Sequence, residues 1–264
     1  MKLKKSFYMT AGIPLGLENL SLETQLNILN QGDLPIRDLR HLRETSQNLK
    51  LVVDDFVRGK LIRLKNQGPS FIRDFLATKE SVTSDNAWTI LGLFKQTYPS
   101  LTLTMSIEKA CQQLLDQATL QLKNALVLQN PGAFADLALQ QTAEEIRTWF
   151  SNPINHPLLQ NVRWLSLSGR GLSLIPSELR FLSNLKWLFL HANQLTAIAP
   201  QTFANLRILQ RLELGQNQLT AIAPQTFANL SNLLELNLQM NPMTAAGPID
   251  RASLGLAEGV WVFL

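Results

Sequence analysis

The sequence contains one cysteine, Cys111, and a thiol is a side chain that readily acts as a nucleophile when a neighbouring base activates it. No histidine stands close to Cys111 in the sequence, although an activating group brought near by folding stays an alternative. Apolar residues recur around this cysteine at steps of three and four, which indicates the buried face of a helix. They are Ile107, Leu114, Leu115, Ala118 and Leu122. We therefore expect a buried structural thiol that forms no internal disulfide.

Other chemistries have no clear basis in the sequence. His191 has no second His or Cys at the spacing of metal ligands, so we interpret it as a contact residue. The sequence shows no glycine-rich phosphate loop and no pair of carboxylates placed for acid–base catalysis. We predict a protein that is not an enzyme, with no catalytic residue, no metal and no cofactor.

The composition is that of a folded chain, because 45% of the 264 residues are hydrophobic and 17% are charged. The formal net charge of +4 is too small an excess to indicate a nucleic-acid partner, which requires a dense stripe of Lys and Arg. No apolar run approaches the roughly 18 residues of a membrane helix, and the N-terminus lacks the features of a signal peptide. We expect a soluble protein of a reducing compartment, without stable membrane insertion.

An internal repeat dominates the second half of the sequence, where residues 194–206 recur without change at residues 218–230, an offset of 24 residues. Leucines occupy the first, fourth and sixth places of each unit, and an asparagine occupies the ninth. Three units follow this pattern, with Leu185, Leu188, Leu190 and Asn193, then Leu209, Leu212, Leu214 and Asn217, then Leu233, Leu236, Leu238 and Asn241. An earlier, degenerate unit has Val162, Leu165 and Leu167, with Arg170 at the asparagine place.

This pattern is identified as that of the leucine-rich-repeat family in its 24-residue form, over roughly residues 159–243. The leucines are expected to point into a solenoid of stacked parallel strands, and each Asn to bond buried backbone groups of the neighbouring turn. Phe203 and Phe227 share one place and should stack. Arg170, between two glycines, departs from the family and indicates a looser turn in a capping unit.

Both ends of such a stack need caps. Residues 142–145 (Thr-Ala-Glu-Glu) have the pattern of a capping box that begins a helix, and Ile146, Trp149 and Phe150 should pack on the open N-terminal end. At the other end, residues 259–264 are apolar and rich in strand formers, so we expect a last strand that covers the C-terminal edge.

Residues between the leucines of each strand should face outward on the concave sheet, where we expect a protein target to bind. These residues are Trp164, Trp187, Phe189, His191, Arg211, Glu213, Glu235 and Asn237. Trp164 and Trp187 should be neighbours, and aromatic anchors are enriched in interfaces. The alternative is that the preceding helices cover these rings.

The first half is predicted to be helical, with one helix over residues 20–29, a turn, and a second helix over residues 38–53. This stretch resembles an F-box over about 35 residues. The matching positions are Leu20, Glu23, Ile28, Leu29, Asp38, Leu39, Leu42, Arg43, Ser46 and Leu49. It departs from the family at Ser21, Thr24, Thr45 and Leu49, and the link between the two parts is about two residues longer.

The resemblance implies a docking ridge for the Skp adaptor of SCF ubiquitin ligases. Carried over position by position, that ridge would be formed by Leu20, Ile28, Leu29, Leu39 and Leu42. The alternative is that these side chains are the core of an ordinary helical domain. Residues 146–150 and the turn that follows them are also similar to leucine-rich-repeat effectors of intracellular bacteria, which implies entry into the host cytoplasm without a classical signal peptide.

These observations together predict an α+β protein: an N-terminal helical domain followed by a short leucine-rich-repeat solenoid with parallel strands on its concave face. We expect an F-box-like region at residues 1–65, a helical region with the N-terminal cap at residues 66–155, and the repeats with their C-terminal cap at residues 156–264. The predicted function is that of a non-catalytic substrate receptor, which links a host SCF-type ligase to a target held by the repeats. The alternative is a plain binding module or inhibitor of one partner, with no ubiquitin role.

Overall fold

The computed structural model describes residues 8–9, 13–14, 29, 34, 36–45, 47–79, 81–98, 106–199, 201–245 and 250–264. The chain divides into two compact units, Met1–Gln113 and Leu114–Leu264. Helix α6 (Ile107–Gln129) contains the division. None of the described helices combines the length and the apolar character that crossing a membrane requires.

The first unit is helical, with a short antiparallel pair of strands, β1 (Tyr8–Met9) and β2 (Ile13–Pro14), near its start. Its described helices are α2 (Ile36–Thr45), α3 (Gln47–Gln67), α4 (Ser70–Ala77) and α5 (Ala87–Thr97). The single helix predicted over residues 38–53 is wrong, because the stretch is divided between α2 and α3. These two helices pack against each other, and Leu39 and Leu42 of α2 are buried. If the two formed one straight helix, these leucines could not pack against α3.

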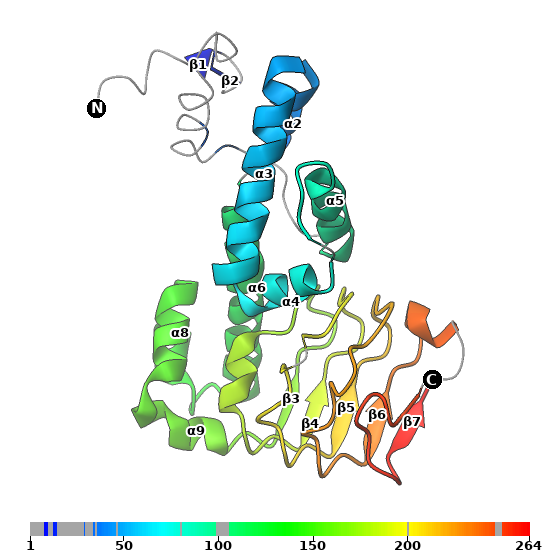
Figure 1. The fold of residues 1–264 in the computed structure, drawn as a ribbon. Coiled ribbons are helices and arrows are strands. Elements are labelled where there is room, and N and C mark those ends of the chain that lie inside the picture. Colours follow the sequence, from blue (N-terminus) through cyan, green and yellow to red (C-terminus); the bar gives the residue numbers. More distant parts are fainter. Residues whose placement is uncertain are drawn as a thin grey trace. The chain divides into compact units, whose positions relative to one another are not determined.

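The second unit contains a parallel sheet whose strands follow one another in sequence order (Figure 1). Its strands are β3 (Trp164–Ser166), β4 (Trp187–Phe189), β5 (Arg211–Glu213), β6 (Glu235–Asn237) and β7 (Trp261–Phe263). The central leucines Leu165, Leu188, Leu212 and Leu236 pair in register and are fully buried. The prediction of a helical region followed by a short solenoid of parallel strands is therefore confirmed.

The repeated asparagines hold successive turns together as predicted. Asn217 donates through Nδ2 to the carbonyls of Leu190 and Leu214 at 3.0 and 2.9 Å, and its Oδ1 accepts the Leu195 N–H at 3.1 Å. In the first repeat, where Arg170 replaces the asparagine, Asn193 of the next repeat accepts the Arg170 N–H through its side-chain oxygen at 3.0 Å. These asparagines thus satisfy backbone groups of the adjacent turn, and the degenerate first repeat depends on the asparagine of the next one.

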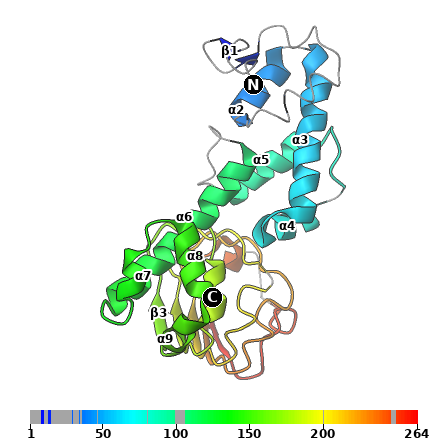
Figure 2. The same cartoon turned by 90° about the vertical axis from the view of Figure 1, so that its left-hand side faces the viewer.

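Helices close the N-terminal end of the solenoid, where α7 (Ala135–Leu139), α8 (Ala143–Ser151) and α9 (His156–Gln160) lie beside β3 (Figure 2). The predicted capping box is present, since Thr142 Oγ1 accepts the Glu145 N–H and the Glu145 carboxylate accepts the Thr142 N–H. These bonds hold the pKa of Glu145 below its usual value. Phe150 is buried and stacks on Phe181 of the first repeat, so α8 caps the open end as expected.

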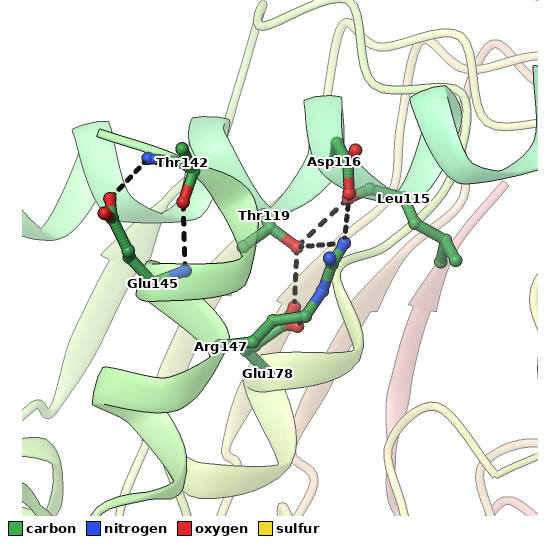
Figure 3. Close-up of polar contacts among 7 residues, drawn as sticks. All are labelled: Leu115, Asp116, Thr119, Thr142, Glu145, Arg147 and Glu178. Carbon is green, nitrogen blue, oxygen red and sulfur yellow. Dashed lines mark hydrogen bonds and ion pairs between the residues drawn. The ribbon is translucent and has the colours of Figure 1, made fainter. Parts of the chain in front are cut away.

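A partly buried ion cluster connects this cap to the solenoid (Figure 3). The guanidinium of Arg147 on α8 lies 2.7 Å from the Asp116 carboxylate on α6 and 3.5 Å from that of Glu178. Glu178 belongs to the short helix η4 (Ser177–Phe181), is buried, and also accepts a 3.3 Å bond from the Thr119 hydroxyl. Three elements therefore meet around one cation.

The C-terminal end is closed by residues 250–264. Strand β7 pairs in parallel with β6, which confirms the last strand predicted from residues 259–264. Residues Ser253 and Leu254 pair their carbonyls with the N–H groups of Gln225 and Phe227 at 2.7 and 3.1 Å. The guanidinium of Arg251 also donates to the carbonyl of Val260, which links the two parts of the cap.

Candidate functional site

The sheet of the second unit presents two rows of outward side chains, which we call the concave face. The first outward place of each strand forms one row: Trp164, Trp187, Arg211, Glu235 and Trp261. The third place of each strand forms the other row: Ser166, Phe189, Glu213, Asn237 and Phe263. Strand pairing in register therefore brings together the residues that the alternation placed on this face.

Aromatic side chains concentrate on the first two strands. Trp164 and Trp187 are direct neighbours in the ladder, and they are 44% and 46% exposed. Phe189, next to them on β4, is half-buried. The Gln129 side chain of α6 donates to the Trp164 carbonyl at 2.8 Å, which fixes the edge strand without covering its ring. The helices of this unit therefore leave both indole rings accessible to a partner.

Charged residues occupy the middle of the concave face. Arg211 lies 2.7 Å from the Glu213 carboxylate on its own strand and 3.2 Å from that of Glu235 on the next. The hydrogen bond to Glu213 is the main reason that the pKa of Arg211 is raised. Glu213 points outward as predicted but is only 8% exposed, because it lies in the central strand beneath its ion pair. It contributes charge to this face and little contact area.

His191 lies just beyond the end of β4, where the Ser168 hydroxyl and its Nδ1 are 3.0 Å apart. This contact orients the imidazole along the sheet. Among the residues that the structure describes, no group of three His, Cys, Asp or Glu side chains is placed to hold a metal ion. His191 is half-buried at this position.

The concave face has two shallow hollows, and Phe189 and Arg211 line both of them. The first, of about 340 Å³, is also lined by Trp187, the exposed Leu234 and Glu235. The second, of about 350 Å³, adjoins His191, Glu213, Gly215 and the amides of the next strand. The concave face therefore combines aromatic side chains, charged side chains and two hollows.

Two further aromatic residues on this face were missed by the sequence analysis. Trp261 and Phe263 of β7 face the same side as Trp187 and Phe189, and they are 72% and 44% exposed. The alternation Trp-Val-Phe contained the signal, but the segment was interpreted only as a cap. The concave face thus has aromatic side chains at both ends and an ion cluster between them.

The F-box-like residues lie in the first unit. Of the five proposed ridge residues, Leu29, Leu39 and Leu42 are buried, whereas Leu20 and Ile28 lie outside the described residues. Arg43, another matching position, is 2.5 Å from the Asp54 carboxylate, which also accepts a 2.7 Å bond from the Trp88 indole. The three described ridge leucines are therefore core, and Arg43 is paired inside the unit.

Cys111 is buried on α6, as the apolar stripe predicted. Burial is the main cause that raises the pKa of its thiol to about 12, and the charge of Glu108 adds to the effect. The thiol is therefore protonated at neutral pH, a state that is a poor nucleophile.

Part of the repeat region matches a known protein family. Residues 183–243 match the family described as leucine rich repeat. Comparison with curated proteins gives no match. The match includes the strands β4, β5 and β6, so the outward residues of these three strands lie within the matched segment.

Two solved structures of bacterial proteins are similar to parts of the chain. One is a leucine-rich-repeat protein of Leptospira interrogans, with 41% identity over 35% of this chain and 23% of that chain, at a TM-score of 0.30. The other is an internalin of Listeria monocytogenes, with 24% identity over 48% of this chain and 33% of that chain, at a TM-score of 0.32. The matched part thus spans about a quarter to a third of each protein's length.

Proposed function

We propose that this chain is a protein-binding module whose partner docks on the concave face of its leucine-rich repeats. The observation that carries the proposal is the pair of neighbouring indoles, Trp164 and Trp187, each with nearly half of its surface exposed. Phe189 extends this apolar surface toward the charged centre of the face. Exposed aromatic surface costs solubility, and protein interfaces are enriched in aromatic anchors.

The proposal assigns no chemical step to the chain. The protonated thiol of Cys111 is buried in the first unit, away from solvent. On the concave face, the Arg211 guanidinium is already paired with two carboxylates, which leaves it a structural and recognition role. Binding through the repeats, rather than catalysis, is the activity that these contacts support.

The experiment is affinity capture from lysate with the full chain and two variants, followed by measurement of dissociation constants with the purified partner. Trp187→Ala removes the central anchor and should weaken binding by about 2 kcal/mol, roughly thirtyfold, if this residue is a hot spot. Ile154→Ala is the control, because Ile154 is a well-exposed apolar side chain that lies outside the sheet.

Proteins retained by the wild type and by Ile154→Ala, but lost with Trp187→Ala, would support docking on the concave face. An equal affinity of all three proteins for every captured partner would place the binding site elsewhere and refute the proposal. Circular dichroism of each variant shows whether the solenoid stays folded, which separates lost contact from lost structure.

A substrate-receptor role in an SCF-type ubiquitin ligase is a finer hypothesis, and it rests on the F-box-like stretch. An adaptor-binding ridge must be accessible to solvent, yet Leu29, Leu39 and Leu42 are buried. The observations therefore favour the plain binding module. The similarity to bacterial effectors adds the hypothesis that the partner is a host protein met in the host cytoplasm.

A direct binding assay with the purified Skp adaptor tests the ligase hypothesis. Saturable binding by the wild type that is lost with Ile28→Asp would support it, with Leu51→Asp as a control on the well-exposed side of α3. If the wild type does not bind the adaptor, the ligase role is refuted while the concave-face proposal still stands.

A further inference from the structure

We propose that the hollow bounded by Phe189, Glu213, Gly215 and Asn237 accepts a lysine or arginine side chain of the docked partner. The proposal rests on the proposed function, since it names one contact of that same face. The hollow lies beside Gly215, the outward place after β5, where the other repeats have Ser168, His191 and Gln239. A volume of about 350 Å³ is sufficient for one long side chain.

The charge balance at this place favours a cation. Arg211 and Glu213 both line the hollow and pair with each other. Glu235 lines the neighbouring hollow and also pairs with Arg211, so these three side chains together carry one net negative charge. Glu213 is largely shielded from water, so its charge is less screened than that of a fully exposed residue. An anionic partner group would find the guanidinium already engaged and two carboxylates beside it.

The shape and chemistry of the surrounding side chains also suit a basic group. Phe189 provides an aromatic ring over which an ammonium or guanidinium group is attracted. The side-chain amide oxygen of Asn237 (Oδ1) accepts the Gln239 N–H at 2.9 Å and keeps a second lone pair for an incoming donor. A guanidinium or ammonium therefore meets a carboxylate, an amide oxygen and a ring in one place.

The distribution of charge along the concave face also favours a cation at this hollow. Arg163 and Lys186 are exposed and precede Trp164 and Trp187 in their strands, so the aromatic end of the face carries positive charge. A basic side chain of the partner is repelled from that end and attracted to the β5–β6 end. This polarity gives the partner a direction along the sheet.

The test uses the full chain, labelled with ¹⁵N, and small capped amino acids as probes. N-acetyl-arginine methylamide and N-acetyl-lysine methylamide should shift the amide resonances of Gly215 and Asn237 saturably, with dissociation constants on the order of 10 mM. N-acetyl-norleucine methylamide, a neutral probe of similar length, should bind at least about fivefold more weakly. Raising the salt from about 50 to 500 mM should weaken the arginine complex.

Two variants locate the effect. Glu235→Gln removes the unbalanced charge and should weaken the arginine probe about fivefold, whereas Phe189→Leu removes the ring and should weaken it about threefold. Glu258→Gln, an exposed position outside the strands, makes the same change in net charge and should have no effect. No saturable shift at about 50 mM probe, equal binding of norleucine, or an equal loss in Glu258→Gln would overturn the proposal.

Failure of this inference is distinguishable from failure of the proposed function. If Trp187→Ala abolishes capture of the partner but the arginine probe does not shift Gly215, the concave face binds protein and the hollow does not select a cation. If the arginine probe binds and Trp187→Ala leaves capture unchanged, the hollow stands as a cation site and the docking proposal falls.

Discussion

The rings of Phe203 and Phe227 stack with their centroids 6.1 Å apart and their planes inclined by 22°. Each ring comes from one of the two identical thirteen-residue segments, and each is 1% exposed. The repeat thus places the same side chain at the same depth in successive turns, and each turn is the packing partner of the next.

Phe227→Ala should lower the free energy of unfolding by about 3–5 kcal/mol, because it leaves a cavity beneath the C-terminal turns. Denaturation by guanidinium chloride measures the change. Phe227→Leu is the milder comparison and should cost less, since it keeps most of the apolar contact. A loss below about 1 kcal/mol in the alanine variant would show that the ring is not packed as described.

Asn217→Ala should destabilise the solenoid by about 1–3 kcal/mol, because it leaves the buried Leu195 N–H without its partner. The carbonyls of Leu190 and Leu214 each lose one bond and keep a second, from Asn193 and Asn241. Asn205→Ala is the control, because the exposed Asn205 makes only one described bond, to the Arg180 carbonyl at 3.2 Å. Urea denaturation compares the two. Equal losses would contradict the role given to the buried asparagine.

Arg147→Ala should destabilise the N-terminal cap by about 3–5 kcal/mol, because it leaves the buried carboxylate of Glu178 without its cation (Figure 3). Hydrogen exchange should show faster opening of α8 than of the sheet. The double variant Arg147→Met with Glu178→Gln removes both charges and should recover much of the loss. No recovery would mean that the arginine acts through packing alone.

Gly255→Ala should destabilise the C-terminal cap by more than about 1 kcal/mol. Its φ of +74° is costly for a residue with a Cβ, and that atom would lie 2.8–2.9 Å from Ala228, including its backbone. Gly259→Ala, also at positive φ but in open space, separates the two causes, and it should cost less. Thermal unfolding with hydrogen exchange of β7 gives the measurement.

Cys111 should resist alkylation by iodoacetamide in the native protein at pH 7.5 and react fully after unfolding, because burial raises its pKa to about 12. The raised pKa also makes the stability of the fold depend on pH. Above the ordinary value of 9.0 the unfolded chain releases a thiol proton that the folded chain keeps, so this group makes stability fall as pH rises through that range. Cys111→Ala should remove this part of the pH dependence, and rapid labelling of the native protein would contradict the burial.

The repeats allowed most of the second unit to be predicted from sequence. The 24-residue spacing identifies the buried leucines, the asparagines and the register that makes Trp164 and Trp187 neighbours. Extending the same alternation to Trp261 and Phe263 would have completed the aromatic row. Alternation predicts which side of a strand a residue faces, but it does not predict how far neighbouring side chains cover that residue. The burial of Glu213 could therefore not be predicted from the sequence.

The first unit was less predictable because its periodicity is shared by every packed helix. Leu39 and Leu42 lie on an apolar stripe whether that stripe packs on α3 or on another protein, and only the fold back onto α3 decides between the two. The partner of Arg43 is equally hidden in the sequence, since Asp54 and Trp88 reach it from two other helices.

The identical segments at residues 194–206 and 218–230 also make the turns of this solenoid interchangeable. A duplicated block of residues 194–217, inserted after Asn217, would present each neighbour with a surface that it already packs against, and both caps would keep their contacts. The solenoid can therefore be lengthened one turn at a time. Each added turn widens the central part of the concave face and moves its two aromatic ends further apart.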